Sequence, residues 1–471
     1  MGSSAGWRRA RSVDGLADSP PLSTTRRRHR AGWANWAGNQ TATPAEVAHP
    51  ANADEVAALV RKAVASGSRL RPIGSGHSFT AIGRPDGAAT TQLVLDRCAD
   101  LLALDAGTGL VTVGAGMTLS RLNRLLAEAG LALTNLGDIE RQTIAGALAT
   151  GTHGTGARFG GLATQVRAFE LVRGDGEIVL CSPHDQADLF AAARVGLGAV
   201  GVVTSVTLQA VPLFALRAEE GSARLSDLLD GFDEFADGVD HAEFYWFPHT
   251  DRTLTKRNTR VSLSAGQGEL EPLGKLRGWF DDEFLSNRVF GMVVAAGRHV
   301  PRAIEPAARI SSRALGARTF TDLSYKVFTS ERRVRFKEME YALPRAELVG
   351  ALREMTAALE RSDLRISFPV EVRVAAADEI WLSTAYGRET GYIAVHVDHG
   401  SPHEEYFALV EAIMTAAGGR PHWGKLHTQT AATLRPRYPK FDDFLAVRAA
   451  SDPAGVLTND YLDQVLGRPG G

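Results

Sequence analysis

The sequence predicts a two-domain protein of the α+β class. Its 471 residues, 44% of them hydrophobic, can bury one large core or two to three ordinary ones. In the first half, amphipathic helical patterns alternate with β-rich runs and glycine-rich turns. From about residue 215 onwards, acidic helices alternate with aromatic runs of period two, as in half-buried antiparallel strands. We therefore expect one domain over residues 36–215 and a second over residues 216–471, built on a large antiparallel sheet flanked by helices.

Charge and cysteine content exclude several classes of protein. The net charge of −2 gives no basic field for nucleic acid. The sequence contains no run of eighteen or more apolar residues, so it predicts no integral membrane segment. Cys98 and Cys181 are too few for a disulfide framework or, by themselves, a zinc site. We expect a soluble protein of a reducing compartment, the cytoplasm.

Residues 1–35 have a different composition from the rest of the chain. They are rich in Arg, Ser and Pro and have no hydrophobic periodicity, which predicts a disordered basic arm. The apolar stretch of an export signal is missing. A solvated tail is the simplest interpretation, and a loose, peripheral contact with an anionic membrane is the alternative.

The first domain carries clear helix and strand signals. Asn52 or Asp54 can cap a helix whose apolar residues from Val56 onwards recur at i, i+3, i+4, i+7 and i+8, and which ends at Gly67. A second amphipathic helix is predicted over residues 118–130. Strands are predicted over residues 90–96, 109–116 and 200–213, with a hairpin over residues 168–182.

Two glycine-rich turns in the first domain favour phosphate binding. They are Gly74-Ser75-Gly76 and residues 151–156. Glycine lets backbone N–H groups approach a phosphate because no Cβ stands in the way. Two such turns predict a ligand with two or more phosphates. The alternative is a pair of ordinary surface turns.

Three rival motifs are incomplete. GAGMTL at 114–119 lacks the third glycine and the acidic residue of a dinucleotide fingerprint. GGRPHWGKL at 418–426 has Leu426 in place of the Ser or Thr of a P-loop, which counts against an NTP-binding module. The elbow G-x-S-x-G of serine hydrolases is absent around Ser75 and Ser78.

The second domain holds candidate catalytic side chains. Glu371 and Arg373 stand at i and i+2 of a predicted strand and so share a face, otherwise made of Val and Phe, where an ion pair is costly unless it has a function or lies at the rim. A salt bridge on an exposed face is the alternative. Lys425 is one of seven lysines and lies in an HWGK cluster, with a solvated lysine as the alternative. No spacing among His396, His399, His422 and His427 supports a metal site.

Several motifs together resemble a known family. They are NWAGNQ followed by IGSGHSF, TIAGALATGTHGTG at 143–156, EVR at 371–373 and RPHWGK at 420–425. In this order they resemble the vanillyl-alcohol-oxidase superfamily of FAD enzymes, in its aldonolactone oxidoreductase and alditol oxidase branch, closest to L-gulono-1,4-lactone dehydrogenases and D-arabinono-1,4-lactone oxidases. The resemblance runs from about Asn35 to Tyr461. It implies a two-lobed FAD-binding domain of the vanillyl-alcohol-oxidase type over 36–215 and a substrate (cap) domain over 216–471, whose last stretch from about 425 returns to the FAD domain.

The resemblance also implies the FAD site. His77 matches a histidine that many members bond covalently to the 8α-methyl carbon of the flavin; a histidine that only hydrogen-bonds near the ring is the alternative. The remaining residues implied to hold FAD are Ile73, Gly74, Ser75, Gly76, Ser78, Phe79, Gly137, Thr143, Gly146, Thr150, Gly151, Thr152, His153, Gly156, Val202 and His422.

For the substrate, the resemblance implies four residues. Glu371 would hold hydroxyl groups, Arg373 would stabilise developing negative charge, Lys425 would polarise a substrate oxygen and His396 would face the substrate. The implied reaction is oxidation of an aldono-1,4-lactone at C2, with hydride passing to flavin N5 and an ascorbate-like product. An alditol oxidase acting on xylitol or sorbitol is the closest alternative, and a flavin-binding protein without chemistry is another. The electron acceptor would be O2 or a cytochrome or quinone, and the residues do not decide between oxidase and dehydrogenase.

Overall fold

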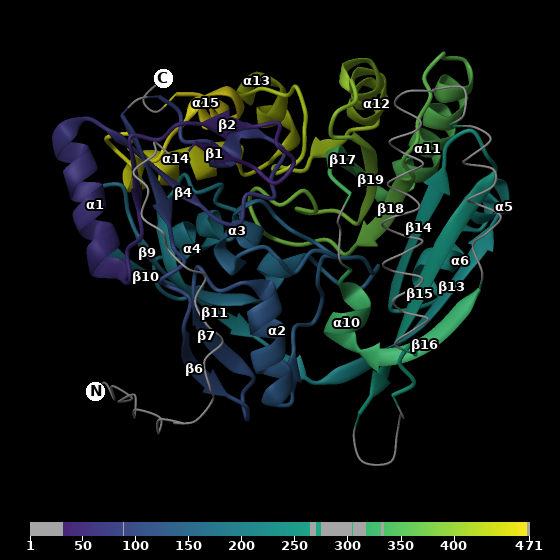
Figure 1. The fold of residues 1–471 in the computed structure, drawn as a ribbon, viewed down its shortest axis with the longest axis horizontal. Coiled ribbons are helices and arrows are strands. Elements are labelled where there is room, and N and C mark those ends of the chain that lie inside the picture. Colours follow the sequence, from purple (N-terminus) through teal and green to yellow (C-terminus); the bar gives the residue numbers. More distant parts are fainter. Residues whose placement is uncertain are drawn as a thin grey trace.

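The fold is of the α+β class, as the sequence predicts, and its three largest sheets are one parallel sheet and two antiparallel sheets (Figure 1). The computed structural model describes residues 32–87, 89–263, 270–274, 304, 317–330 and 334–468. Residues 1–31 of the predicted basic arm lie outside the described residues. Among the described residues, no helix is both long and apolar enough to cross a bilayer.

The parallel sheet leads directly into the first glycine turn. Helix α1 (Ala53–Ser66) begins at Asn52, whose side chain accepts the N–H of Glu55, and ends at Gly67 in the left-handed conformation. Both ends agree with the prediction. β4 (Arg69–Ile73) pairs parallel with β5 (Thr90–Val94), which pairs parallel with β3 (Glu46–Ala48). The chain leaves β4 at Gly74, so the turn stands at the carboxyl end of a parallel strand.

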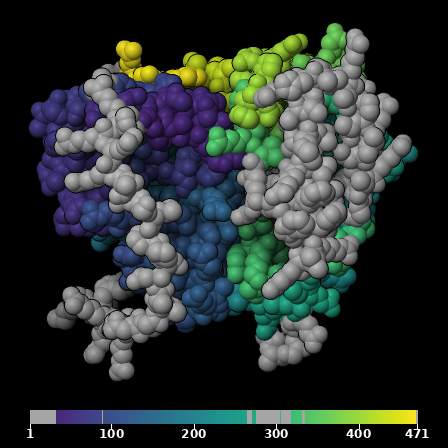
Figure 2. Space-filling model, in the orientation of Figure 1, coloured from purple at the N-terminus to yellow at the C-terminus, as the bar shows by residue number. Residues whose placement is uncertain are grey.

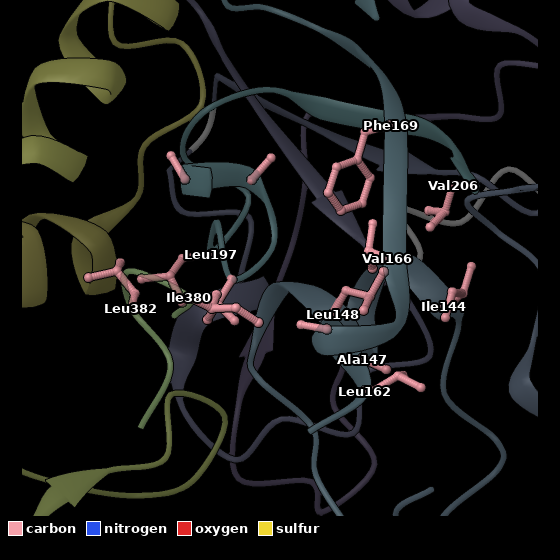
Figure 3. Close-up of a cluster of buried hydrophobic side chains, with 14 of the residues drawn as sticks. Ile144, Ala147, Leu148, Leu162, Val166, Phe169, Leu197, Val206, Ile380 and Leu382 are labelled. Atoms are coloured by element: carbon pink, nitrogen blue, oxygen red, sulfur yellow. The ribbon is translucent and has the colours of Figure 1, made fainter. Parts of the chain in front are cut away.

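A five-stranded antiparallel sheet completes the first part. Its order is β10 (Ile178–Cys181), β9 (Val166–Val172), β11 (Val202–Gln209), β7 (Leu110–Gly114) and β6 (Leu101–Asp105). The predicted hairpin is β9–β10. The predicted second helix is α2 (Leu119–Glu128), and α3 (Ile144–Ala149) and α4 (Ala187–Ala193) follow. Figure 3 shows side chains of α3, β9 and β11 packed together with Ile380 and Leu382, so the second half of the chain contributes to this core.

The largest sheet has eight strands, and each strand is antiparallel to its neighbours. Its order is β16 (Arg318–Leu323), β13 (Phe214–Ala223), β15 (Arg252–Ser262), β14 (His241–Phe247), β18 (Val370–Ala375), β19 (Thr390–Asp398), β17 (Phe336–Pro344) and β20 (Arg420–Pro421). The three predicted aromatic strands are its neighbours β14, β18 and β19.

These central strands are buried on both faces, so the prediction of half-buried strands is wrong. Helices cover one face: α5 (Leu225–Asp230), α6 (Phe232–Asp237), α11 (Arg345–Glu360) and α12 (Glu404–Ala416). Loops of the first part lie against the other face, where His153 lies 2.6 Å from Glu340 and Asp138 lies 3.9 Å from Arg373. The sheet is therefore an internal wall between helices and the first part.

The end of the chain packs on the first part. α14 (Phe441–Ser451) contacts α4, and Asn459, just before α15 (Asp460–Leu466), donates to the carbonyl of Ala81 over 2.9 Å. In Figure 2 the yellow C-terminal residues lie along the purple and blue part. This arrangement favours the expected return of the chain. The remaining elements are β1 (Trp33–Ala34), β2 (Thr41–Ala42), β8 (Leu131–Ala132), β12 (Val211–Pro212), α10 (Ser324–Phe328), α13 (Ala431–Leu434) and 3₁₀ turns at Ala81–Gly83, Leu162–Gln165 and Arg435–Arg437.

Candidate active site

Two cavities meet at the glycine turn that follows β4. The larger has a volume of about 340 Å³ and lies within the first part of the chain. The smaller, about 70 Å³, lies between that part and the eight-stranded sheet. His77 and Ser78 line both cavities. A ligand in the larger cavity therefore has direct access to the smaller one.

The larger cavity is walled mainly by small side chains and by backbone. A Cβ on Gly74 would lie 2.5 Å from Oγ1 of Thr143, the residue that caps α3, so only glycine allows this close approach. Gly76 has a φ of 70°, which also favours glycine. Nine of the residues predicted to hold FAD line this cavity: Ile73, Gly74, Ser75, Gly76, His77, Ser78, Thr143, Gly146 and Thr150.

The turn itself is suited to an anion. In the described part of the chain, the backbone N–H groups of residues 75–78 meet no protein acceptor, whereas the next one, that of Phe79, donates to the carbonyl of Gly424. Consecutive unpaired N–H groups in a concave turn bind phosphate oxygens. The larger cavity therefore fits the diphosphate of FAD.

Sequence reasoning missed several residues of the larger cavity, and three of the residues that it predicted line neither cavity. Ala115, Gly116 and Thr118 line it, although their segment was set aside as an incomplete dinucleotide fingerprint. The available signal was the pair Gly114 and Gly116, which the sequence analysis interpreted only as part of a dinucleotide fingerprint. Leu197, Gly198, Gly201 and Val203 also line it. Of the predicted residues, Gly151, Gly156 and Val202 line neither cavity, and Val202 packs in the core beneath.

His77 stands where the two cavities join. Its ring stacks on Trp36 at a centroid distance of 5.7 Å. Burial, together with the charges of Lys425 and Arg141, lowers the pKa of His77 to about 4. The imidazole is therefore neutral at pH 7 and keeps a free nitrogen lone pair.

The smaller cavity brings together residues from distant parts of the sequence. All four predicted substrate residues line it: Glu371, Arg373, His396 and Lys425. So do eight predicted FAD residues: His77, Ser78, Phe79, Gly137, Thr150, Thr152, His153 and His422. A hydrogen bond of 2.7 Å from the backbone N–H of Phe79 to the carbonyl of Gly424 joins the glycine turn to the HWGK segment.

Arg373 is surrounded by carboxylates. It pairs with Glu371, and its Nε donates to Glu243 over 2.8 Å. The hydroxyl of Tyr245 donates to Glu371 over 2.7 Å. Burial alone would lower the pKa of Arg373, but Glu371 and Glu243 raise it well above its usual value. The guanidinium is therefore permanently charged.

The expectation of an otherwise apolar face is wrong. Val370, Val372 and Val374 belong to the core under the helices, on the opposite face of β18. The face of Glu371 and Arg373 carries charged and aromatic side chains of the neighbouring strands. Glu371 is 6% exposed, which also excludes the alternative of an exposed salt bridge.

A second charged group surrounds Lys425. Its ammonium pairs with Glu338 and lies 3.9 Å from Glu340, and these carboxylates raise its pKa against the effect of burial. Glu338 also lies 3.5 Å from Nε2 of His396, and Glu340 lies 2.6 Å from Nε2 of His153. A solvated Lys425 is thus excluded. Sequence reasoning missed both glutamates, although FKEMEY at 336–341 has the period-two pattern that puts them on one face.

Two groups of three possible metal ligands lie in the smaller cavity. They are His153, Glu340 and His422, and Glu338, Glu371 and His396, with ligand atoms within 4.8 Å of one another. Each group contains at least one carboxylate that pairs with Lys425 or Arg373. A divalent cation would be repelled by these neighbouring cations, so the arrangement favours ion pairs over a metal centre.

Comparisons with known proteins match both parts of the chain. A family model described as D-arabinono-1,4-lactone oxidase matches residues 206–465, and one described as FAD binding domain matches residues 44–182. The chain is 44% identical to L-gulono-1,4-lactone dehydrogenase of Mycobacterium tuberculosis over 92% of this chain and 99% of that protein. It is 33% identical to an alditol oxidase of a Streptomyces species over 92% of this chain and 98% of that protein.

A solved structure confirms the predicted fold type. Cholesterol oxidase from Brevibacterium sterolicum superposes with a TM-score of 0.78, covering 92% of this chain and 96% of that one. The two sequences are 19% identical. This likeness concerns the fold alone.

Proposed function

The chain belongs to the D-arabinono-1,4-lactone oxidase family of FAD-linked aldonolactone oxidoreductases, and from this premise we propose that it oxidises C2 of an aldono-1,4-lactone, with L-gulono-1,4-lactone as the leading substrate. One observation carries the proposal: Arg373, Lys425 and the His77 turn line the same small cavity, next to a larger one suited to a diphosphate. The domains would divide near residue 215, with the cap domain supplying the cations.

The first part of the chain would hold FAD. The N–H groups of residues 75–78 would bind its diphosphate, and the cavity wall formed by Gly116 and Gly198 leaves room for its adenosine. We propose that a ring nitrogen of His77 is bonded to the 8α-methyl carbon of the flavin, since the neutral imidazole is a competent nucleophile. This bond would replace one methyl hydrogen and the N–H proton of the imidazole, and the two electrons released would pass to the flavin ring system. When bound, FAD supplies the acceptor for the two electrons and the hydrogen that leave C2.

The second part would hold the substrate and stabilise charge. Glu371 offers a carboxylate oxygen to substrate hydroxyls. Arg373 and Lys425 place two fixed cations beside the oxygen that loses its proton, where a buried cation stabilises negative charge more than water does. His396 lies beside Glu338 on the same wall and would orient the sugar ring.

The absorption spectrum of the purified protein under argon tests the proposal. Addition of L-gulono-1,4-lactone should bleach the flavin band, because no acceptor is present to reoxidise it. Xylitol is the parallel control. Bleaching by xylitol but not by the lactone would reassign the chain to the alditol oxidases, and a colourless protein would refute FAD binding. Admission of O2 afterwards, with the rate of colour return compared with that given by a quinone, identifies the acceptor.

A further inference from the structure

Arg373 belongs to a row of charged side chains that runs straight across five strands of the eight-stranded sheet. Each member is the direct cross-strand partner of the next. Direct partners in antiparallel strands point to the same face, so the row lies on one side of the sheet. Its signs alternate: Arg373 on β18, Glu243 on β14, Lys256 on β15, Glu220 on β13 and Arg318 on β16.

The contacts in the row are close at both ends. Nε of Arg373 donates to Glu243 over 2.8 Å, and the other carboxylate oxygen of Glu243 lies 3.2 Å from Nζ of Lys256. At the far end, Arg318 lies 2.6 Å from Glu220. Lys256 and Glu220 face one further small cavity behind the active site. Glu243 is 9% exposed and lines that cavity but not the active-site cavity.

Two nitrogens of the Arg373 guanidinium have different partners. Nε donates to Glu243. Nη2 pairs with Glu371 and lies 3.9 Å from Asp138, and both of these carboxylates line the active-site cavity. An arginine has several rotamers and loses conformational freedom when one edge is fixed. Glu243 therefore restrains a guanidinium that lines the active-site cavity, although Glu243 itself does not line that cavity.

We propose that Glu243 is a positioning residue for the reaction, which holds the guanidinium of Arg373 so that Nη2 faces the substrate. The inference rests on the proposed function, since it takes Arg373 as the group that stabilises charge on the substrate oxygen. Lys256 has a supporting part. Three carboxylates, those of Glu371, Glu243 and Asp138, surround the single positive charge of Arg373. Lys256 offsets the negative charge of Glu243. Arg373 and Lys256 together lower the pKa of Glu243 to about 2, against the effect of burial.

The test is Glu243→Gln, which keeps the shape of the side chain and removes its charge. We expect kcat for the lactone to fall about tenfold or more, as for loss of a charged hydrogen bond, with the FAD content unchanged. Glu220→Gln is the matched control, because it makes the same change in the same row but contacts Arg318 rather than Arg373. It should leave kcat within about twofold of the wild type.

A double-mutant cycle separates positioning from a general structural role. In the Arg373→Ala background, Glu243→Gln should have no further effect on kcat, because the group it positions is gone. An equal fall of kcat in both backgrounds, or no fall in the wild-type background, would overturn the inference. If Arg373→Ala itself keeps full turnover, the proposed function fails first, so the two failures are distinguishable.

Glu243→Asp and Glu243→Gln/Lys256→Gln cover the case in which Glu243→Gln does not fold. Asp keeps the charge but is one methylene shorter, so kcat should fall while the melting temperature stays near that of the wild type. The double variant removes both charges and should restore the fold without restoring kcat. If kcat stays normal in either variant, Glu243 serves folding only and the inference is wrong.

Discussion

The two cavities that meet at His77 have different kinds of wall. The larger is walled by backbone N–H groups and small residues, and its turn needs glycine at positions where a Cβ would collide. The smaller is walled by charged side chains of β17, β18 and the HWGK segment, which pair with one another, and by His396 of β19. A short turn can thus offer a cofactor site through its local backbone geometry, whereas the charges of the proposed substrate site depend on pairing between strands far apart in the sequence.

The first prediction concerns the charged cavity and has the largest expected effect. Arg373→Ala should lower kcat for the lactone about a thousandfold while FAD stays bound, because the stabilising cation is lost and the larger cavity is untouched. Stopped-flow reduction of the flavin measures the rate directly. Loss of FAD from this variant would show that the two cavities are not independent, and an unchanged rate would make the Glu371–Arg373 pair structural.

The second prediction concerns the backbone cavity. Gly74→Ala places a Cβ against Thr143 and should weaken FAD binding about tenfold to a hundredfold, as for other overpacked sites. The flavin-to-protein absorbance ratio measures it, and turnover per bound flavin should change little. Gly350→Ala on α11 is the control, because nothing lies within 4 Å of its Cβ position. Equal flavin content in both variants would show that the turn can shift to admit the side chain.

This contrast explains how much the sequence could reveal. The turn after β4 could be predicted because its chemistry lies in seven consecutive residues. The period-two pattern also put Glu371 and Arg373 on one face correctly. Their partners could not be found in this way, because Glu243 is 130 residues from Arg373 and Glu338 is 87 residues from Lys425. A strand pattern gives the face of each residue but not the neighbouring strand, so which residues share the face of Glu371 required the sheet order β14-β18-β19-β17.

The third prediction concerns the junction of the cavities. His77→Ala should release its flavin when the protein is precipitated with acid, whereas the wild type should keep a yellow pellet, because only a covalent bond survives denaturation. Turnover should fall about tenfold or less, since the reacting groups Arg373 and Lys425 are untouched. Flavin in the supernatant of the wild type would refute the covalent bond and leave His77 as a noncovalent contact of the ring.

The last prediction is a pH dependence of stability that arises at four histidines, of which only His77 and His422 line the cavities. Burial lowers the pKa of His77, His241, His422 and His427 from 6.5 to about 4. The unfolded chain therefore binds more protons than the folded one below pH 6.5, and stability should fall as the pH drops from about 6.5 to 4, by at most about 1.4 kcal/mol per pH unit for each histidine. The lowered pKa values of Glu243 and Glu340 affect stability only below about pH 4.5, so they do not contribute to the upper part of this pH range.

Urea unfolding at pH 7, 6 and 5 measures the slope of stability against pH. His241→Asn, at a histidine that lines neither cavity, should reduce that slope by the share of one histidine. A slope unchanged by His241→Asn would mean that this buried imidazole already carries a proton in the folded protein.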